Sequence, residues 1–171
     1  MSRLSEKCCD ACRHGWDHPC PDLIKCMTDG PVCHDNGDCR ELRTKSMAKL
    51  RREKLDRPVV FVGTGTCGLG AGAGKTLAAV KQWLVDKNVS ADVVEVGCIG
   101  LCAVEPIMDI QMPGKARVSL QEVEAASVAG LLDAVIVNGT VPAGKVLGQF
   151  RPAAESAATA WPGVGMLDEH P

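Results

Sequence analysis

This sequence is poor in aromatic residues, with three tryptophans, two phenylalanines and no tyrosine among its 171 residues. Proteins that bind single-stranded nucleic acid stack the bases on aromatic rings, so that class of function is poorly supported. The formal net charge of −2 also provides no basic field that would attract nucleic acid. Composition therefore argues against a nucleic-acid-binding protein.

Long apolar runs and signal-peptide features are also missing. No run reaches the roughly 18–20 apolar residues that a membrane-spanning helix needs. The first nine residues, MSRLSEKCC, contain no apolar core of a secretory signal, so we expect a cytoplasmic protein. Histidine is absent between residues 35 and 169, and no acid–base catalyst stands out there. A function that needs no such catalyst, such as electron transfer, fits this absence.

Cysteine, by contrast, is abundant: the chain has ten. Clustered cysteines in a reducing compartment usually indicate metal or redox chemistry rather than structural disulfides. Three of them follow residue 60, at Cys67, Cys98 and Cys102. The other seven fall within the first 39 residues, at Cys8, Cys9, Cys12, Cys20, Cys26, Cys33 and Cys39.

Residues 1–43 are predicted to form a small metal-binding module. Few apolar residues are available there, so the segment needs a cross-link in order to fold, and a bound metal ion is the natural one. Zinc, held by four cysteine or histidine ligands, and a second iron–sulfur cluster both fit, while disulfides or free thiols remain alternatives. The predicted ligands are Cys9, Cys12, Cys20, Cys26, Cys33, Cys39 and His34. Residues 44–57, charged and rich in helix formers, are predicted to be a helical connector.

The segment 58–140 alternates between strand and helix patterns. Strands are expected at 58–62, 91–96, 106–112 and 116–120, and a first helix at 76–88. A closing helix is expected to start at a capping box formed by Ser119 and Glu122. This β-α-β-β-β-α order predicts an α/β fold of the thioredoxin-like kind. Residues 141–171, rich in Pro, Gly and Ala, are expected to be an extended tail that docks on a partner.

Cys67, Cys98 and Cys102 each follow one of the first two predicted strands. If these strands are parallel neighbours, the turns that follow them lie at the same end of the sheet, so three thiolates converge on exposed loops. Thiolates on glycine-rich loops are typical ligands of iron–sulfur clusters. Three buried, apolar cysteines are the simpler alternative.

These residues carry a family resemblance. The segment VGTGTCGLGAGA and the later VEVGCIGLCAVEPIMDI, with its C-I-G-L-C-A-x-x-P motif, resemble the thioredoxin-like [2Fe-2S] ferredoxin family. That family includes the small iron–sulfur subunit of respiratory complex I and domains of flavin-binding subunits of NADH-linked hydrogenases and formate dehydrogenases. The resemblance spans residues 58 to about 151. It implies a [2Fe-2S] cluster on Cys67, Cys98 and Cys102, and partners that are flavin- and NAD-binding and iron–sulfur oxidoreductase subunits.

One of the family's four ligands is missing: where the family has its first cysteine, this sequence has Val62. Thr64, Thr66 or a cysteine of the N-terminal module could supply a fourth ligand. Alternatively, the domain carries no cluster and is a metal-stapled scaffold that docks the flavin-bearing partner. A small thiol-redox enzyme is the third hypothesis, although Cys98-x3-Cys102 lacks the C-x-x-C spacing of thioredoxin-type chemistry.

Two nucleotide-binding motifs occur in the glycine-rich turn but are incomplete. Gly63-x-Gly65-x-x-Gly68 resembles a dinucleotide fingerprint, yet too few parallel strands follow it for a Rossmann domain. Gly74-Lys75-Thr76 resembles the end of a phosphate-binding loop whose first glycine is out of register. A tight turn, in which glycine lets a helix approach closely, is the preferred interpretation of both.

Overall fold

The computed structural model describes residues 41, 52, 55–151 and 158–167. By contact density the chain divides into two compact units, Met1–Glu53 and Lys54–Pro171. The seven predicted ligands of the N-terminal module and most of the predicted connector lie outside the described residues. Residues 55–151 and 158–167 all belong to the second unit.

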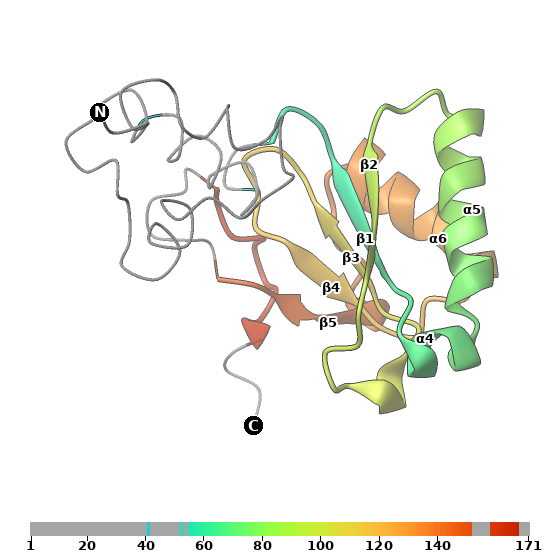
Figure 1. The fold of residues 1–171 in the computed structure, drawn as a ribbon. Coiled ribbons are helices and arrows are strands. Elements are labelled where there is room, and N and C mark those ends of the chain that lie inside the picture. The colour runs from blue at the N-terminus through green and yellow to red at the C-terminus, as the bar shows by residue number, and fades with distance from the viewer. Residues whose placement is uncertain (1–40, 42–51, 53–54, 152–157, 168–171) are drawn as a thin grey trace, which may run out of the picture. The chain divides into compact units, whose positions relative to one another are not determined.

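A single mixed sheet forms the centre of this unit (Figure 1). Its order is β2-β1-β3-β4-β5, with β1 and β2 parallel and every other neighbouring pair antiparallel. A parallel β-α-β unit followed by an antiparallel hairpin is the thioredoxin-like arrangement, so the predicted fold class is confirmed. The strands are β1 (Val59–Gly63), β2 (Asp92–Val96), β3 (Met108–Gln111), β4 (Val118–Leu120) and β5 (Val146–Gln149).

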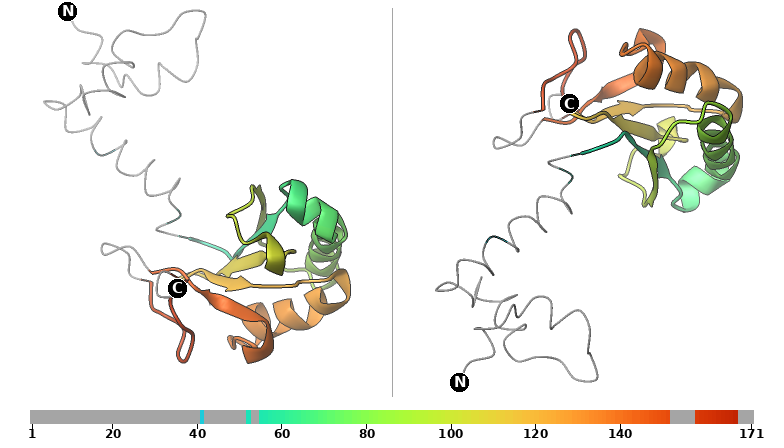
Figure 2. Two further views of the ribbon diagram at one scale, coloured as in Figure 1. Left: turned by 90° about the horizontal axis from the view of Figure 1, so that it is seen from below. Right: turned by 90° about the horizontal axis from the view of Figure 1, so that it is seen from above.

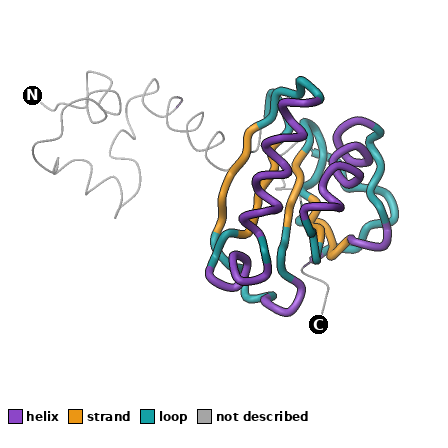
Figure 3. The backbone as a smooth tube through the Cα atoms, turned by 90° about the vertical axis from the view of Figure 1, so that its right-hand side faces the viewer, coloured by secondary structure: helices purple, strands orange, loops and turns teal. Residues whose placement is uncertain are grey.

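The two longer helices lie side by side on one face of this sheet (Figures 2 and 3). The crossover from β1 to β2 contains α4 (Thr66–Ala71) and α5 (Ala73–Asp86). After β4 the chain forms α6 (Ala125–Leu132), which continues as a π-helical turn, η3 (Asp133–Val137). Short 3₁₀ helices precede β3 and β5, namely η2 (Cys102–Val104) and η4 (Ala143–Lys145). Of the helices in the described part of the chain, none combines the length and apolarity that crossing a bilayer requires.

The hydrophobic core lies between the sheet and these helices. Alternate strand residues point to opposite faces, and one set from each central strand joins the core: Val60 and Val62, Met108 and Ile110, Val118 and Leu120. From α5, Val80 and Trp83 are buried against them and Leu77 and Leu84 are partly buried. The helix predicted at 76–88 is confirmed, although it begins earlier, at Ala73.

The predicted capping box was wrong. Ser119 lies within β4, paired with Asp109 on one side and Gly148 on the other, and is fully buried. Glu122 has a positive φ of 49°, outside the helical region. The helix begins later, at Ala125, because pairing with two neighbouring strands holds Ser119 in extended backbone.

The described residues after 140, which are 141–151 and 158–167, do not form an extended tail that leaves the domain. Val146–Gln149 form β5, which adds to the edge of the sheet beside β4. Trp161 is buried, and its indole N–H donates to the carbonyl of Ala116 over 2.8 Å. The sheet thus extends beyond the predicted domain boundary, while docking of residues 141–171 on a partner remains a prediction.

Candidate metal centre

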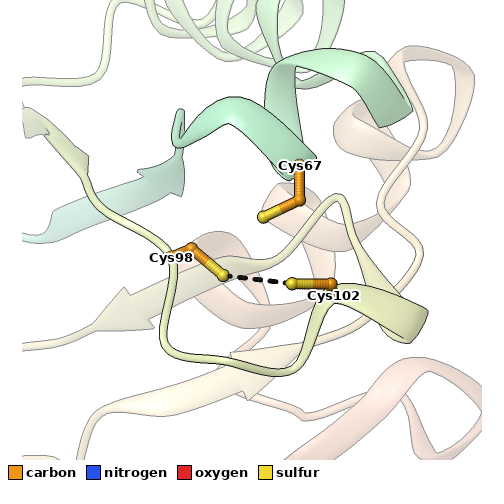
Figure 4. Close-up of side chains that lie close together, drawn as sticks. All are labelled: Cys67, Cys98 and Cys102. Carbon is orange, nitrogen blue, oxygen red and sulfur yellow. Dashed lines mark hydrogen bonds between the residues drawn. The ribbon is translucent and has the colours of Figure 1, made fainter.

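Three cysteines converge at the carboxyl end of the parallel strand pair. Cys67 lies in the first turn of α4, directly after β1, whereas Cys98 follows β2 and Cys102 opens η2. Their three sulfur atoms all lie within 4.8 Å of one another. The sulfurs of Cys98 and Cys102 are 3.5 Å apart, and the Cys67 side chain points toward them (Figure 4). Cys67 is half-buried and the other two are exposed.

Glycines allow the two cysteine-bearing loops to approach each other. A Cβ atom built on Gly65 would lie 3.0 Å from the backbone nitrogen of Cys98, so a side chain there would push the loops apart. A Cβ atom on Gly68 would lie only 2.2 Å from the carbonyl oxygen of Gly63. Close backbone approach therefore explains the Gly63-x-Gly65-x-x-Gly68 pattern.

The second nucleotide-like motif also has a structural explanation. Lys75 and Thr76 lie within α5 rather than in a loop. The Thr76 side chain is fully buried, and its hydroxyl donates to the carbonyl of Val123 over 2.6 Å. This hydroxyl ties α5 to the segment before α6, so it is not available to a phosphate or a magnesium ion.

Hydrogen bonding lowers the pKa of one thiol, that of Cys98, and raises the pKa of another, that of Cys67. The pKa of Cys98 is lowered, first because its sulfur accepts a hydrogen bond from Cys67 and then because it accepts one from the Gly100 N–H over 3.2 Å. The pKa of Cys67 is raised to about 12, chiefly because its thiol donates to Cys98 and then to Cys102, with burial adding to the effect. Without metal, a proton thus stays among the sulfurs, and a bound cation would have to displace it.

The donor set suits a thiolate-bound metal. Sulfur ligands favour zinc, copper(I) and iron–sulfur clusters over hard cations. With metal–sulfur bonds of about 2.3 Å, two thiolates on one tetrahedral ion lie about 3.8 Å apart, close to the 3.5 Å between Cys98 and Cys102. The Gly100 N–H bond to Cys98 is of the kind that tunes metal–thiolate centres. The residues present therefore fit such a centre, provided that a fourth ligand completes it.

A side chain at position 62 could not supply the missing fourth ligand. The Val62 side chain is fully buried in the core between the sheet and the helices, and Val62 is paired with Met108. The next residue, Gly63, faces the opposite side of the sheet. A Cβ atom built there would lie 3.2 Å and 3.5 Å from the two carboxylate oxygens of Glu105. The space beside Gly63 is thus filled by a carboxylate.

Glu105 is the site residue that the sequence analysis missed. Its side chain is buried, with 8% of its surface exposed. The carboxylate oxygen Oε2 accepts a hydrogen bond from the Ile107 N–H over 2.7 Å, and Oε1 lies 3.9 Å from the sulfur of Cys67. The one acidic residue between β2 and β3, three positions after Cys102, was the sequence signal that could have identified it.

No protein-family model matches this chain, and no curated protein matches it. Among solved structures, a thioredoxin-like [2Fe-2S] ferredoxin from Aquifex aeolicus is similar at 15% identity, covering 58% of this chain and 98% of that chain, with a TM-score of 0.49. Another structure, of the wild-type ferredoxin from that organism, gives 14% identity, 54% and 98% coverage and a TM-score of 0.47. A variant of that ferredoxin with one cysteine replaced by serine is 14% identical, with 53% of this chain and 97% of that chain covered and a TM-score of 0.45.

Proposed function

We propose that this chain is an electron-transfer protein that holds a [2Fe-2S] cluster on Cys67, Cys98 and Cys102. The observation that carries the proposal is the convergence of three thiols within 4.8 Å on glycine-bracketed loops. The C-I-G-L-C-A-x-x-P motif containing two of these cysteines resembles that of [2Fe-2S] ferredoxins. When bound, the cluster supplies reversible one-electron redox chemistry.

The surface around the thiols supports exchange of electrons with a partner protein. Five large apolar side chains are exposed among the described residues, and three of them lie within two positions of a cysteine of the site. These three are Leu69, Ile99 and Leu101. Single exposed apolar residues are common, but a group around a redox centre would let a partner dock with little water in between. Because Cys98 and Cys102 are exposed, a docked partner would come close to the centre.

The proposed setting is a multi-subunit, NADH-linked oxidoreductase in the cytoplasm. There the chain would be an accessory subunit that exchanges electrons with a flavin- and NAD-binding subunit and with other iron–sulfur subunits. Support for this setting comes from the family resemblance of residues 58 to about 151. The chain itself would bind and position the cluster and the partner rather than catalyse a reaction.

Reduction of the anaerobically purified chain tests this function. Dithionite should bleach the visible absorption reversibly, take up one electron per chain and produce an electron paramagnetic resonance signal of the reduced cluster. The same treatment of a Cys98→Ser variant should produce neither change. A wild-type chain that shows no reversible one-electron reduction would contradict electron transfer.

A second candidate function is a metal-stapled scaffold that docks the flavin-bearing partner and transfers no electrons. The mutual distances of the three sulfurs favour this scaffold function, because thiolates within 4.8 Å can also share one tetrahedral zinc ion. Zinc without acid-labile sulfide in this unit would support the scaffold. Iron with an equal amount of sulfide would exclude it.

A further inference from the structure

A buried carboxylate, that of Glu105, lies beside the Cys67 thiol. Glu105 is 8% exposed, and in the described part of the chain no lysine or arginine forms an ion pair with it. Burying an ionised carboxylate without a cation is costly. A metal centre at the adjacent thiols would supply the positive charge that this carboxylate lacks.

One oxygen of this carboxylate is anchored to the backbone, and the other faces the thiols' side at Cys67. Oε2 accepts the Ile107 N–H over 2.7 Å, which fixes the plane of the group at the start of β3. The Ile107 carbonyl in turn accepts the Gly63 N–H over 3.0 Å, so the anchor is part of the β1–β3 pairing. Oε1 faces Cys67, whose thiol donates to it over 3.9 Å. This is the orientation of a preorganised ligand with a supporting hydrogen bond.

Two of the distances among the four donors fit pairs of ligands on one ion. Ligands of one tetrahedral ion with metal–sulfur bonds of about 2.3 Å and metal–oxygen bonds of about 2.1 Å lie about 3.6 Å apart. The Cys67 sulfur and Glu105 Oε1 are within a few tenths of an ångström of that value, at 3.9 Å. The sulfurs of Cys98 and Cys102, at 3.5 Å, are similarly close to the two-thiolate value. A [2Fe-2S] cluster takes two protein ligands on each iron, so these two pairs would together supply the four protein ligands.

Other candidates for the fourth position fit less well. Val62 is committed to the core. Thr66 is exposed and Thr64 is only partly buried, and neither hydroxyl makes a described hydrogen bond toward the thiols. We propose that Glu105 is the fourth protein ligand, with Oε1 completing a site of three thiolates and one carboxylate. This inference rests on the proposed function and names its missing ligand.

The test uses the full chain, reconstituted anaerobically with ferrous iron and sulfide. Glu105→Gln has nearly the same shape as glutamate, and its amide oxygen can still accept the Ile107 N–H, but it removes the charged oxygen. We expect the variant to lose iron to a chelator about tenfold faster or more than the wild type, with altered visible and electron paramagnetic resonance spectra. Glu95→Gln is the matched control, because Glu95 is exposed on β2 beside Lys81, and it should behave as the wild type.

A rescue variant separates a ligand from a purely structural residue. A Cβ on Gly63 would point at the Glu105 carboxylate, so the double variant Gly63→Cys/Glu105→Ala would place a thiol where the carboxylate was. We expect it to regain iron and sulfide, with a spectrum that differs from that of the wild type because all four ligands are then thiolates. In the wild type itself, infrared difference spectra with 13C-labelled glutamate should show one carboxylate band shift on cluster loading. That measurement does not depend on whether any variant folds.

Each outcome bears on a different claim. A wild type that loads the cluster, together with a Glu105→Gln variant of unchanged spectra and iron loss and no shifted carboxylate band, would overturn the role of Glu105 and leave the proposed function intact. A wild type that takes up no iron and sulfide at residues 67, 98 and 102 would overturn both. Cluster loading with faster loss in Glu105→Gln, an unchanged Glu95→Gln and the carboxylate shift would support both.

Discussion

Among single residues, Cys67 and Cys98 of the metal centre differ in acidity although their sulfurs lie within 4.8 Å of each other. Cys98 accepts hydrogen bonds from Cys67 and from the Gly100 N–H, which favours its thiolate, while Cys67 is the donor and keeps its proton. A cysteine thiolate is the form that reacts with electrophiles and binds metals. The order of ionisation is therefore observable in the metal-free protein.

Alkylation should follow that order. Because the pKa of Cys98 lies below its ordinary value of 9.0, Cys98 is more ionised at pH 8 than a typical cysteine. Cys67, with a pKa of about 12, is almost entirely protonated at that pH. Brief iodoacetamide treatment of the metal-free chain, followed by peptide mass spectrometry between pH 7 and 9, should label Cys98 before Cys67. Preferential labelling of Cys67 would contradict the hydrogen-bond assignment.

A second residue-level prediction concerns Gln149, which is buried in β5. Its side chain donates to the carbonyls of Trp161 and Val164 over 3.1 Å and 2.6 Å, and accepts the Trp161 N–H over 2.7 Å. Gln149→Leu should lower the free energy of unfolding by about 1–3 kcal/mol, because it leaves buried backbone groups unpaired. Urea unfolding measures this loss. The control is Gln82→Leu, because Gln82 is exposed on α5 and, among the described residues, its amide bonds to Asp86 alone. This change should alter the stability by no more than about 0.5 kcal/mol.

At this scale the thiols were predictable from the sequence, whereas the carboxylate was not. The three cysteines were predictable because each follows a strand of a parallel pair, whose carboxyl ends share an edge. Glu105 stands in a loop before Pro106, where an acidic residue is ordinarily solvated. Only the closeness of Gly63, which has no side chain, makes room for its carboxylate beside Cys67.

Among the elements, the turn between β1 and α4 holds the site together. The position of Cys67 relative to Cys98 depends on how closely the two loops approach, and Gly65 sets that limit. The strands and α5 were predictable from alternation and helical periodicity. The start of α6 was not, because a local match to a capping box competes with strand pairing at Ser119, and only the three-dimensional sheet shows which prevails. β5 was missed because its Gly-containing sequence becomes a strand only beside β4.

Gly65→Ala should weaken metal binding more than it weakens the fold. The added methyl group would lie 3.0 Å from the Cys98 nitrogen and would displace the cysteine loop. We expect a substantial loss of bound metal, measured per chain after reconstitution, with unchanged far-ultraviolet circular dichroism. Gly70→Ala within α4 is the control, since a Cβ built on Gly70 meets no atom of the described residues within 4 Å apart from its chain neighbours and the backbone of its own helix. Equal metal content in both variants would contradict this role of Gly65.

In the whole molecule, two units coexist in one chain: Met1–Glu53, with seven cysteines, and Lys54–Pro171, with three. Substituting Cys9 and Cys12 by serine should remove metal from the N-terminal module. If all ligands of the second unit belong to that unit, its visible and electron paramagnetic resonance spectra should stay unchanged. A changed spectrum would show that a cysteine of the N-terminal module reaches the centre at Cys67, Cys98 and Cys102.

The most direct measurement is the content of iron, acid-labile sulfide and zinc in the anaerobically purified full chain, for the wild type and for Cys98→Ser. The proposed [2Fe-2S] centre predicts about two iron and two sulfide per chain from this unit, both lost in the variant while the fold persists. Zinc without sulfide, in amounts that the substitution does not change, would contradict the electron-transfer function and leave the scaffold function.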